Sequence, residues 1–99
     1  MLKLQSLLQK QPNDPFLLYG IAMEHRKAGD SPDALVFYDR TIAADPNYCY
    51  AYFQKGQLLE SLGDVEAARQ TYQQGIEAAQ RSGDSHARSE IEGALEMLA

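Results

Sequence analysis

The chain has 99 residues, of which 44% are hydrophobic and 23% charged, as in an ordinary soluble globular domain. No stretch reaches the roughly 18 apolar residues of a membrane span, and the first residues are too polar for a secretory signal. Nine basic against fourteen acidic residues give a net charge of −5, and no basic cluster exceeds Arg26-Lys27, which argues against a nucleic-acid partner. We therefore expect a cytoplasmic protein that binds neither nucleic acid nor membrane.

The first predicted helix covers about residues 2–11 and ends before Pro12, because the residue preceding a proline avoids the helical region. The second covers about 15–28, with Pro15 in its first turn and Gly29 as the left-handed residue that ends it. The residues expected on its inward face are Leu18, Ile21, Ala22 and His25.

The third predicted helix covers about 32–45, with Ser31 as N-cap and Pro32 at the first helical position. Its expected inward stripe is Ala34, Leu35, Tyr38, Thr41 and Ile42. The fourth helix covers about 49–62 and closes at Gly63. The stripe of the fourth helix is Tyr52, Phe53, Gly56 and Leu59.

The fifth predicted helix covers about 65–81 and is capped by Asp64. Its stripe consists of Val65, Ala68, Tyr72, Gly75, Ile76 and Ala79. The last helix, about 85–98, follows the segment Ser82-Gly83-Asp84-Ser85, which is predicted to be a turn followed by a cap. Its stripe consists of Ala87, Ile91, Ala94, Leu95 and Leu98. No segment alternates apolar and polar residues as a strand does, so the predicted class is all-α.

A period of 34 residues relates the middle four helices. It separates the pairs Gly29-Asp30 and Gly63-Asp64. The same offset relates Ala34 to Ala68, Tyr38 to Tyr72, and Ile42 to Ile76. A fixed period of this length with helical spacing inside each unit indicates stacked helical hairpins.

Paired helices with a Gly-Asp turn after the first and the Asp45-Pro46 stop after the second resemble the tetratricopeptide repeat. The resemblance implies a right-handed α-α superhelix of antiparallel helix hairpins. It places one repeat at 15–48 and a second at 49–82. Residues 1–14 are then an N-terminal flanking helix and 83–99 a C-terminal capping helix, giving six helices in one domain.

The resemblance also implies a protein-binding adaptor or scaffold, because the first helices of such repeats line a concave groove. The positions that line it here are Phe16, Tyr19, Met23, Arg26, Tyr50, Phe53, Gln57 and Glu60. Their aromatic side chains are expected to form a platform for a peptide or partner protein. The alternative is that the terminal helix covers them, or that some of the rings belong to the core. One variety of the family grips a C-terminal carboxylate with Lys and Asn at the fifth and ninth positions. Tyr19, Met23, Phe53 and Gln57 stand there instead, so that clamp is absent.

An alternative is a structural module that self-associates end to end through the ends of the helix stack, or through a convex face. Five apolar residues run from Ala34 to Tyr38, and one stripe cannot bury all of them. Val36 and Phe37 are therefore expected as an exposed pair on the convex side, where a second copy could dock, although we expect a monomer.

No arrangement of residues suggests catalysis, a cofactor or a metal. His25 lies on an apolar helical face, where packing is the expected role, and His86 has no histidine partner at helical spacing. Cys49 opens a helix without a histidine nearby in sequence, which favours an inert thiol over a nucleophile. The sequence thus predicts that the protein is not an enzyme.

Overall fold

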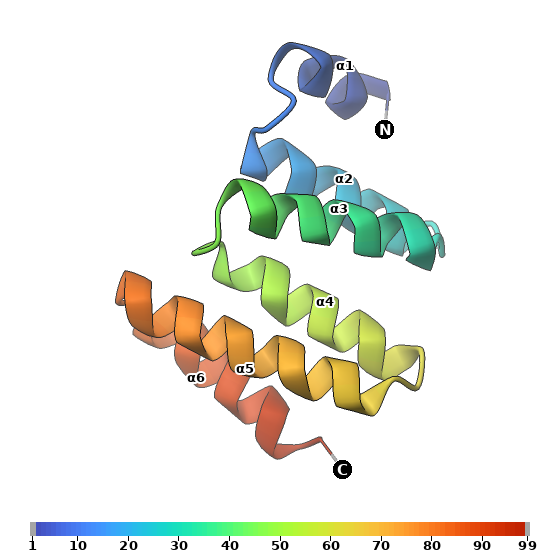
Figure 1. The fold of residues 1–99 in the computed structure, drawn as a ribbon. Helices are drawn as coiled ribbons and strands as arrows, with labels where there is room; N and C mark the ends of the chain where they lie inside the picture. Colours follow the sequence, from blue (N-terminus) through green and yellow to red (C-terminus); the bar gives the residue numbers. More distant parts are fainter. Residues whose placement is uncertain (1, 99) are drawn as a thin grey trace. The chain divides into compact units, whose positions relative to one another are not determined.

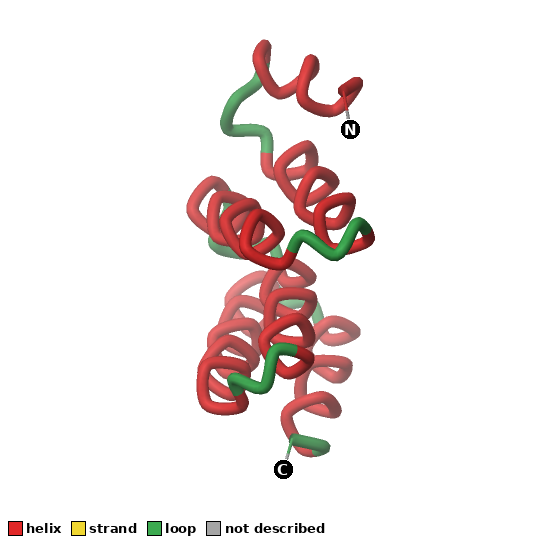
Figure 2. Tube along the Cα trace, turned by 90° about the vertical axis from the view of Figure 1, so that its right-hand side faces the viewer, coloured by secondary structure: helices red, strands yellow, loops and turns green. Residues whose placement is uncertain are grey.

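The computed structural model describes residues 2–98, and this range contains six α-helices and no strand (Figures 1 and 2). They are α1 (Leu2–Lys10), α2 (Pro15–Lys27), α3 (Ser31–Ala44), α4 (Cys49–Ser61), α5 (Val65–Ser82) and α6 (Ser85–Glu96). The predicted all-α class is confirmed, and the predicted helix ends differ from these by at most two residues. Within residues 2–98 no helix combines the length and the apolar character needed to cross a bilayer.

The helices fall into two compact units, residues 1–46 and 47–99. In the first unit, α2 and α3 lie side by side in opposite directions, and α1 contacts α2 (Figure 1). In the second unit, α4 and α5 form the equivalent hairpin, and α6 packs mainly against α5. The two hairpins are the packed elements that the 34-residue period predicts.

Each hairpin turn is built by a glycine followed by an aspartate. Gly29 has φ +81° and Gly63 φ +84°, the left-handed conformation that lets the chain leave the preceding helix. The following aspartates are the N-caps of α3 and α5, since Asp30 Oδ1 accepts from the Asp33 amide and Asp64 Oδ1 from the Ala67 amide.

The predicted cap at Ser31 is therefore wrong. Ser31 is the first residue of α3 and Asp30 its cap. Likewise, Ser85 is the first residue of α6, while Asp84 accepts from the Ala87 amide at 3.0 Å. In both cases the aspartate directly follows the last residue of the turn, so its side chain reaches the free amides of the first helical turn.

The predicted stripes largely form the two cores. In the first unit, Leu18, Ile21, Ala22, Ala34, Tyr38 and Thr41 are buried, and in the second, Tyr52, Leu59, Ala68, Tyr72, Ala79 and Ile91. Val65, which opens α5 directly after the turn, is 37% exposed. Other stripe residues are half-buried, among them Leu35, Ile42, Phe53 and Ile76.

The α4–α5 crossing depends on a glycine in each helix. A Cβ added to Gly56 would lie 2.3 Å from Cε1 of the Tyr72 ring, and one added to Gly75 would lie 2.7 Å from Cβ of Tyr52. Each tyrosine thus fills the space that the facing glycine leaves open, which allows the helices to approach closely.

Candidate peptide-binding faces

The α2 face consists of the predicted positions Phe16, Tyr19, Met23 and Arg26. Phe16 is 70% exposed, whereas the other three are half-buried. The Tyr19 ring lies 6.2 Å from the ring of Tyr38 on α3, and the Tyr38 hydroxyl donates to the Met23 sulfur at 3.0 Å. The face therefore projects one aromatic ring into solvent and rests on a buried tyrosine.

The α4 face consists of Tyr50, Phe53, Gln57 and Glu60. The first three are half-buried and Glu60 is exposed. Tyr50 meets Phe53 edge-on at 6.4 Å, and Phe53 lies 6.5 Å from the Tyr72 ring of α5. The Tyr72 hydroxyl donates to the Glu60 carboxylate. Aromatic rings thus run along this face and end at a carboxylate held by a buried hydroxyl.

Tyr38 and Tyr72 support the two faces from beneath, whereas the sequence predicts them only as core residues. Both rings are fully buried, so they were expected only as core residues, yet their hydroxyls reach side chains of the first helix in each hairpin. The signal was present in the sequence, since the two tyrosines are 34 residues apart. A buried tyrosine hydroxyl needs a hydrogen-bond partner, and these are the partners.

The pKa of Tyr38 is raised above its ordinary value of 10.0, chiefly because burial disfavours the phenolate. A hydrogen bond with Arg26 and the positive charge of its guanidinium lower the pKa in part. The hydroxyl therefore stays protonated, as a donor to Met23.

Alkaline pH is expected to destabilise the fold partly through Tyr38. Its proton leaves the unfolded chain at about pH 10 but the folded chain only at higher pH, so stability is complete below pH 10 and falls as the pH rises above it. Tyr38→Phe should flatten this loss, as measured by urea denaturation between pH 8 and 11. Parallel pH dependences for the wild type and the variant would contradict a raised pKa.

The expected exposed pair on α3 is present only in part. Val36 is 51% exposed, but Phe37 is half-buried. The Phe37 ring stacks on the His25 imidazole at 5.4 Å, and the Arg40 guanidinium lies 4.9 Å from its centroid. Phe37 is therefore engaged within its own hairpin, because it follows Val36 by one helical position and points toward α2.

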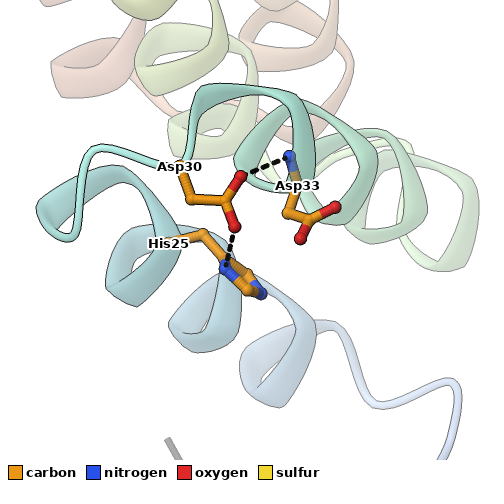
Figure 3. Close-up of side chains that lie close together, drawn as sticks. All are labelled: His25, Asp30 and Asp33. Atoms are coloured by element: carbon orange, nitrogen blue, oxygen red, sulfur yellow. Dashed lines mark hydrogen bonds and ion pairs between the residues drawn. The ribbon is translucent and has the colours of Figure 1, made fainter.

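His25, Asp30 and Asp33 gather at the turn between α2 and α3 (Figure 3). His25 Nδ1 lies 3.4 Å from Asp30 Oδ2, and the three potential ligand atoms lie within 4.8 Å of one another. Such a trio could in principle offer ligands to a divalent cation. The same contacts also serve the fold, since the Asp30 carboxylate joins α2 to the first turn of α3 (Figure 3).

We expect the melting temperature to be unchanged by EDTA or by added zinc. One oxygen of Asp30 is already used in the cap, and Asp33 is exposed, so the trio is a poor cage for a metal. Thermal melts of the purified protein check this. A shift of several degrees that disappears in His25→Asn would instead identify the trio as a metal site.

The Cys49 thiol and the His86 imidazole each have polar groups close to them in the fold. The Cys49 thiol is buried and lies 3.3 Å from the Asn47 carbonyl oxygen and 3.7 Å from the Ser82 hydroxyl. His86 Nε2 lies 2.8 Å from a Glu90 carboxylate oxygen one helical turn away. A buried thiol is a poor nucleophile.

Comparison with known sequences identifies the architecture. A sequence model of the tetratricopeptide repeat matches residues 37–70. A TPR repeat-containing protein of Pseudomonas aeruginosa is 30% identical over 88 residues, which are 89% of this chain and 84% of that protein. The chain belongs to the tetratricopeptide repeat (TPR) family. The resemblance first seen in the Gly-Asp turns is thereby confirmed.

Solved TPR structures have the same fold. The solution structure of a TPR domain protein from Salinibacter ruber matches with a TM-score of 0.80 at 37% identity, over 85% of each chain. PcrH, solved in complex with the chaperone binding region of PopD, matches with a TM-score of 0.88 over 96% of this chain and 72% of PcrH. At 19% identity the second likeness concerns the fold alone. TPR domains are in general protein-interaction modules, and this chain has their architecture.

Proposed function

We propose that this TPR protein is an adaptor that binds a peptide segment of a partner protein through its α2 and α4 faces. We place its repeats at the bounds expected from the sequence, 15–48 and 49–82, with flanking helices within 1–14 and 83–99. PcrH lends support, since a protein with this fold was solved with a segment of another protein.

The exposed Phe16 ring is the observation that carries this proposal. A phenylalanine that is 70% exposed costs free energy in water, and burial of its ring by a partner would recover it. Tyr19, one helical turn further along the same face, is half-buried and held against Tyr38. An immobilised ring loses little conformational entropy on binding, which suits Tyr19 to recognition.

The proposed role requires no catalysis and no cofactor. The Cys49 thiol is buried, the His25 ring stacks on Phe37, and His86 contacts Glu90. Cytoplasmic location and a monomeric state remain predictions from the sequence.

Oligomeric state separates the adaptor from the alternative, a module that self-associates through Val36 and Phe37. Phe37 packs against His25 and Arg40, so Val36 is the exposed member of that pair. The apolar area of one valine is small for the interface of a stable dimer. Light scattering across the micromolar range should therefore give the 11.0 kDa mass of a monomer. A dimer that dissociates in Val36→Asp would favour self-association.

A further inference from the structure

The α4 face differs in charge from the α2 face at equivalent positions. Arg26 near the end of α2 corresponds to Glu60 near the end of α4, 34 residues later. In the first hairpin the buried tyrosine hydroxyl interacts with Arg26 and Met23, whereas in the second it donates to Glu60. The two faces should therefore prefer different partner side chains.

The Glu60 carboxylate is oriented before any partner arrives. Its hydrogen-bond donor, Tyr72, is fully buried, so the hydroxyl has a fixed position. Because the donor is a neutral hydroxyl, this hydrogen bond does not neutralise the negative charge of Glu60. The Glu60 side chain is also exposed. An exposed carboxylate that is held in place loses little conformational freedom when it pairs with a cation.

Aromatic rings lie on the same helical face as this carboxylate. Phe53 precedes Glu60 by seven residues, which is two helical turns or roughly 10 Å along the axis. Tyr50 packs edge-on against Phe53. The long aliphatic stem of a lysine or arginine can lie along such rings while its cationic head reaches a carboxylate.

Further acidic groups surround the Tyr50 end of the face. Burial raises the pKa of Tyr50, and the negative charges of Glu90 and then Asp84 raise it further. Glu90 is also in contact with His86, and Asp84 caps α6. The unit as a whole, residues 47–99, has eight acidic and four basic residues and so carries −4 of the net charge of −5.

We infer that the α4 face binds a lysine or arginine side chain of the partner, with Phe53 beneath its stem and Glu60 paired with its charge. This inference rests on the proposed function and narrows it to a partner segment that carries a basic residue beside an apolar anchor. Tyr72 is a positioning residue, since its hydroxyl holds the Glu60 carboxylate.

Three synthetic peptides can test this inference, with leucine at the same positions and lysine, glutamine or glutamate at all others. We expect the Leu/Lys peptide to bind most tightly and to shift the amide resonances of Tyr50, Phe53 and Glu60 in ¹⁵N-labelled protein. Glu60→Gln should weaken its binding about fivefold, the upper range for an exposed ion pair. Glu77→Gln, which removes an exposed charge of α5 outside this face, should change the affinity by less than about twofold.

Tyr72→Phe retains the ring and removes only the hydroxyl, so it tests the positioning role. It should weaken Leu/Lys binding in the wild-type background and have no additional effect in Glu60→Gln, because the hydroxyl acts through that carboxylate. Equal losses in both backgrounds would mean that Tyr72 affects binding through the fold and not through Glu60.

The outcomes separate this inference from the adaptor function. Equal binding of the Leu/Gln and Leu/Lys peptides, or equal weakening by Glu60→Gln and Glu77→Gln, would overturn the basic-residue preference and leave the adaptor function standing. Failure of all three peptides to shift any residue of the α2 or α4 face would contradict both.

Discussion

Gly56→Leu is expected to destabilise the second unit so strongly that α4 and α5 no longer pack. Even the first side-chain carbon would lie 2.3 Å from the Tyr72 ring, and that ring is fully buried and cannot swing away. Overpacking of a core typically costs about 1–3 kcal/mol, and a branched side chain at a helix crossing belongs at or above the upper end. Urea denaturation followed by circular dichroism should show the loss.

Gly93→Ala provides the matched control, because it also replaces a helical glycine. A Cβ at Gly93 would have no heavy atom within 4 Å, so this variant gains helix propensity without a clash. It should stabilise α6 by about 0.5–1 kcal/mol. The free energy of unfolding of Gly56→Ala should lie between those of Gly56→Leu and Gly93→Ala. An unchanged unfolding midpoint for Gly56→Leu would show that α4 and α5 do not cross at this glycine.

The helices and hairpins could be predicted because their signals are local. Proline and the Gly-Asp pairs mark the ends of the helices, and the 34-residue offset aligns one hairpin with the other. The N-cap of α3 could also have been predicted. The offset aligns Asp30 with Asp64, so the cap inferred for the fifth helix indicated the same residue type in the third. Ser31 competes with Asp30 in the sequence, because serine before proline is itself a favourable helix start.

The polar contacts of the two faces could not be predicted in the same way. Tyr72 and Glu60 are 12 residues apart and lie on different helices. Their hydrogen bond therefore depends on the helix crossing that Gly56 permits. Period and polarity alone cannot determine that geometry. The stacking of Phe37 on His25 is another such case, since it depends on how α2 and α3 face each other.

Partner binding is expected to be lost when Tyr19 and Phe53 are both replaced by serine. Each ring lies on a predicted binding face, and aromatic anchors commonly carry most of the binding free energy of an interface. The structure also predicts a moderate loss of stability, about 1–3 kcal/mol in total, because the rings contact Tyr38 and Tyr72. The double variant should still fold, which circular dichroism and thermal melting can verify.

Phe16→Ser provides a control for this loss of stability. Because Phe16 is 70% exposed, its replacement should change the free energy of unfolding by less than about 0.5 kcal/mol and still weaken partner binding. Retention of a pulled-down partner by both the Phe16→Ser and the double variant would show that neither face carries the interaction.

The most direct test of the adaptor function is an NMR titration of the ¹⁵N-labelled protein with the segment of a partner recovered by pull-down. The adaptor function predicts amide shift changes concentrated at Phe16, Tyr19 and Met23 of the α2 face and at Tyr50, Phe53 and Gln57 of the α4 face. The Tyr19→Ser/Phe53→Ser variant should show none of them. Changes confined to the surroundings of Val36, or the same saturable changes in the double variant, would contradict it.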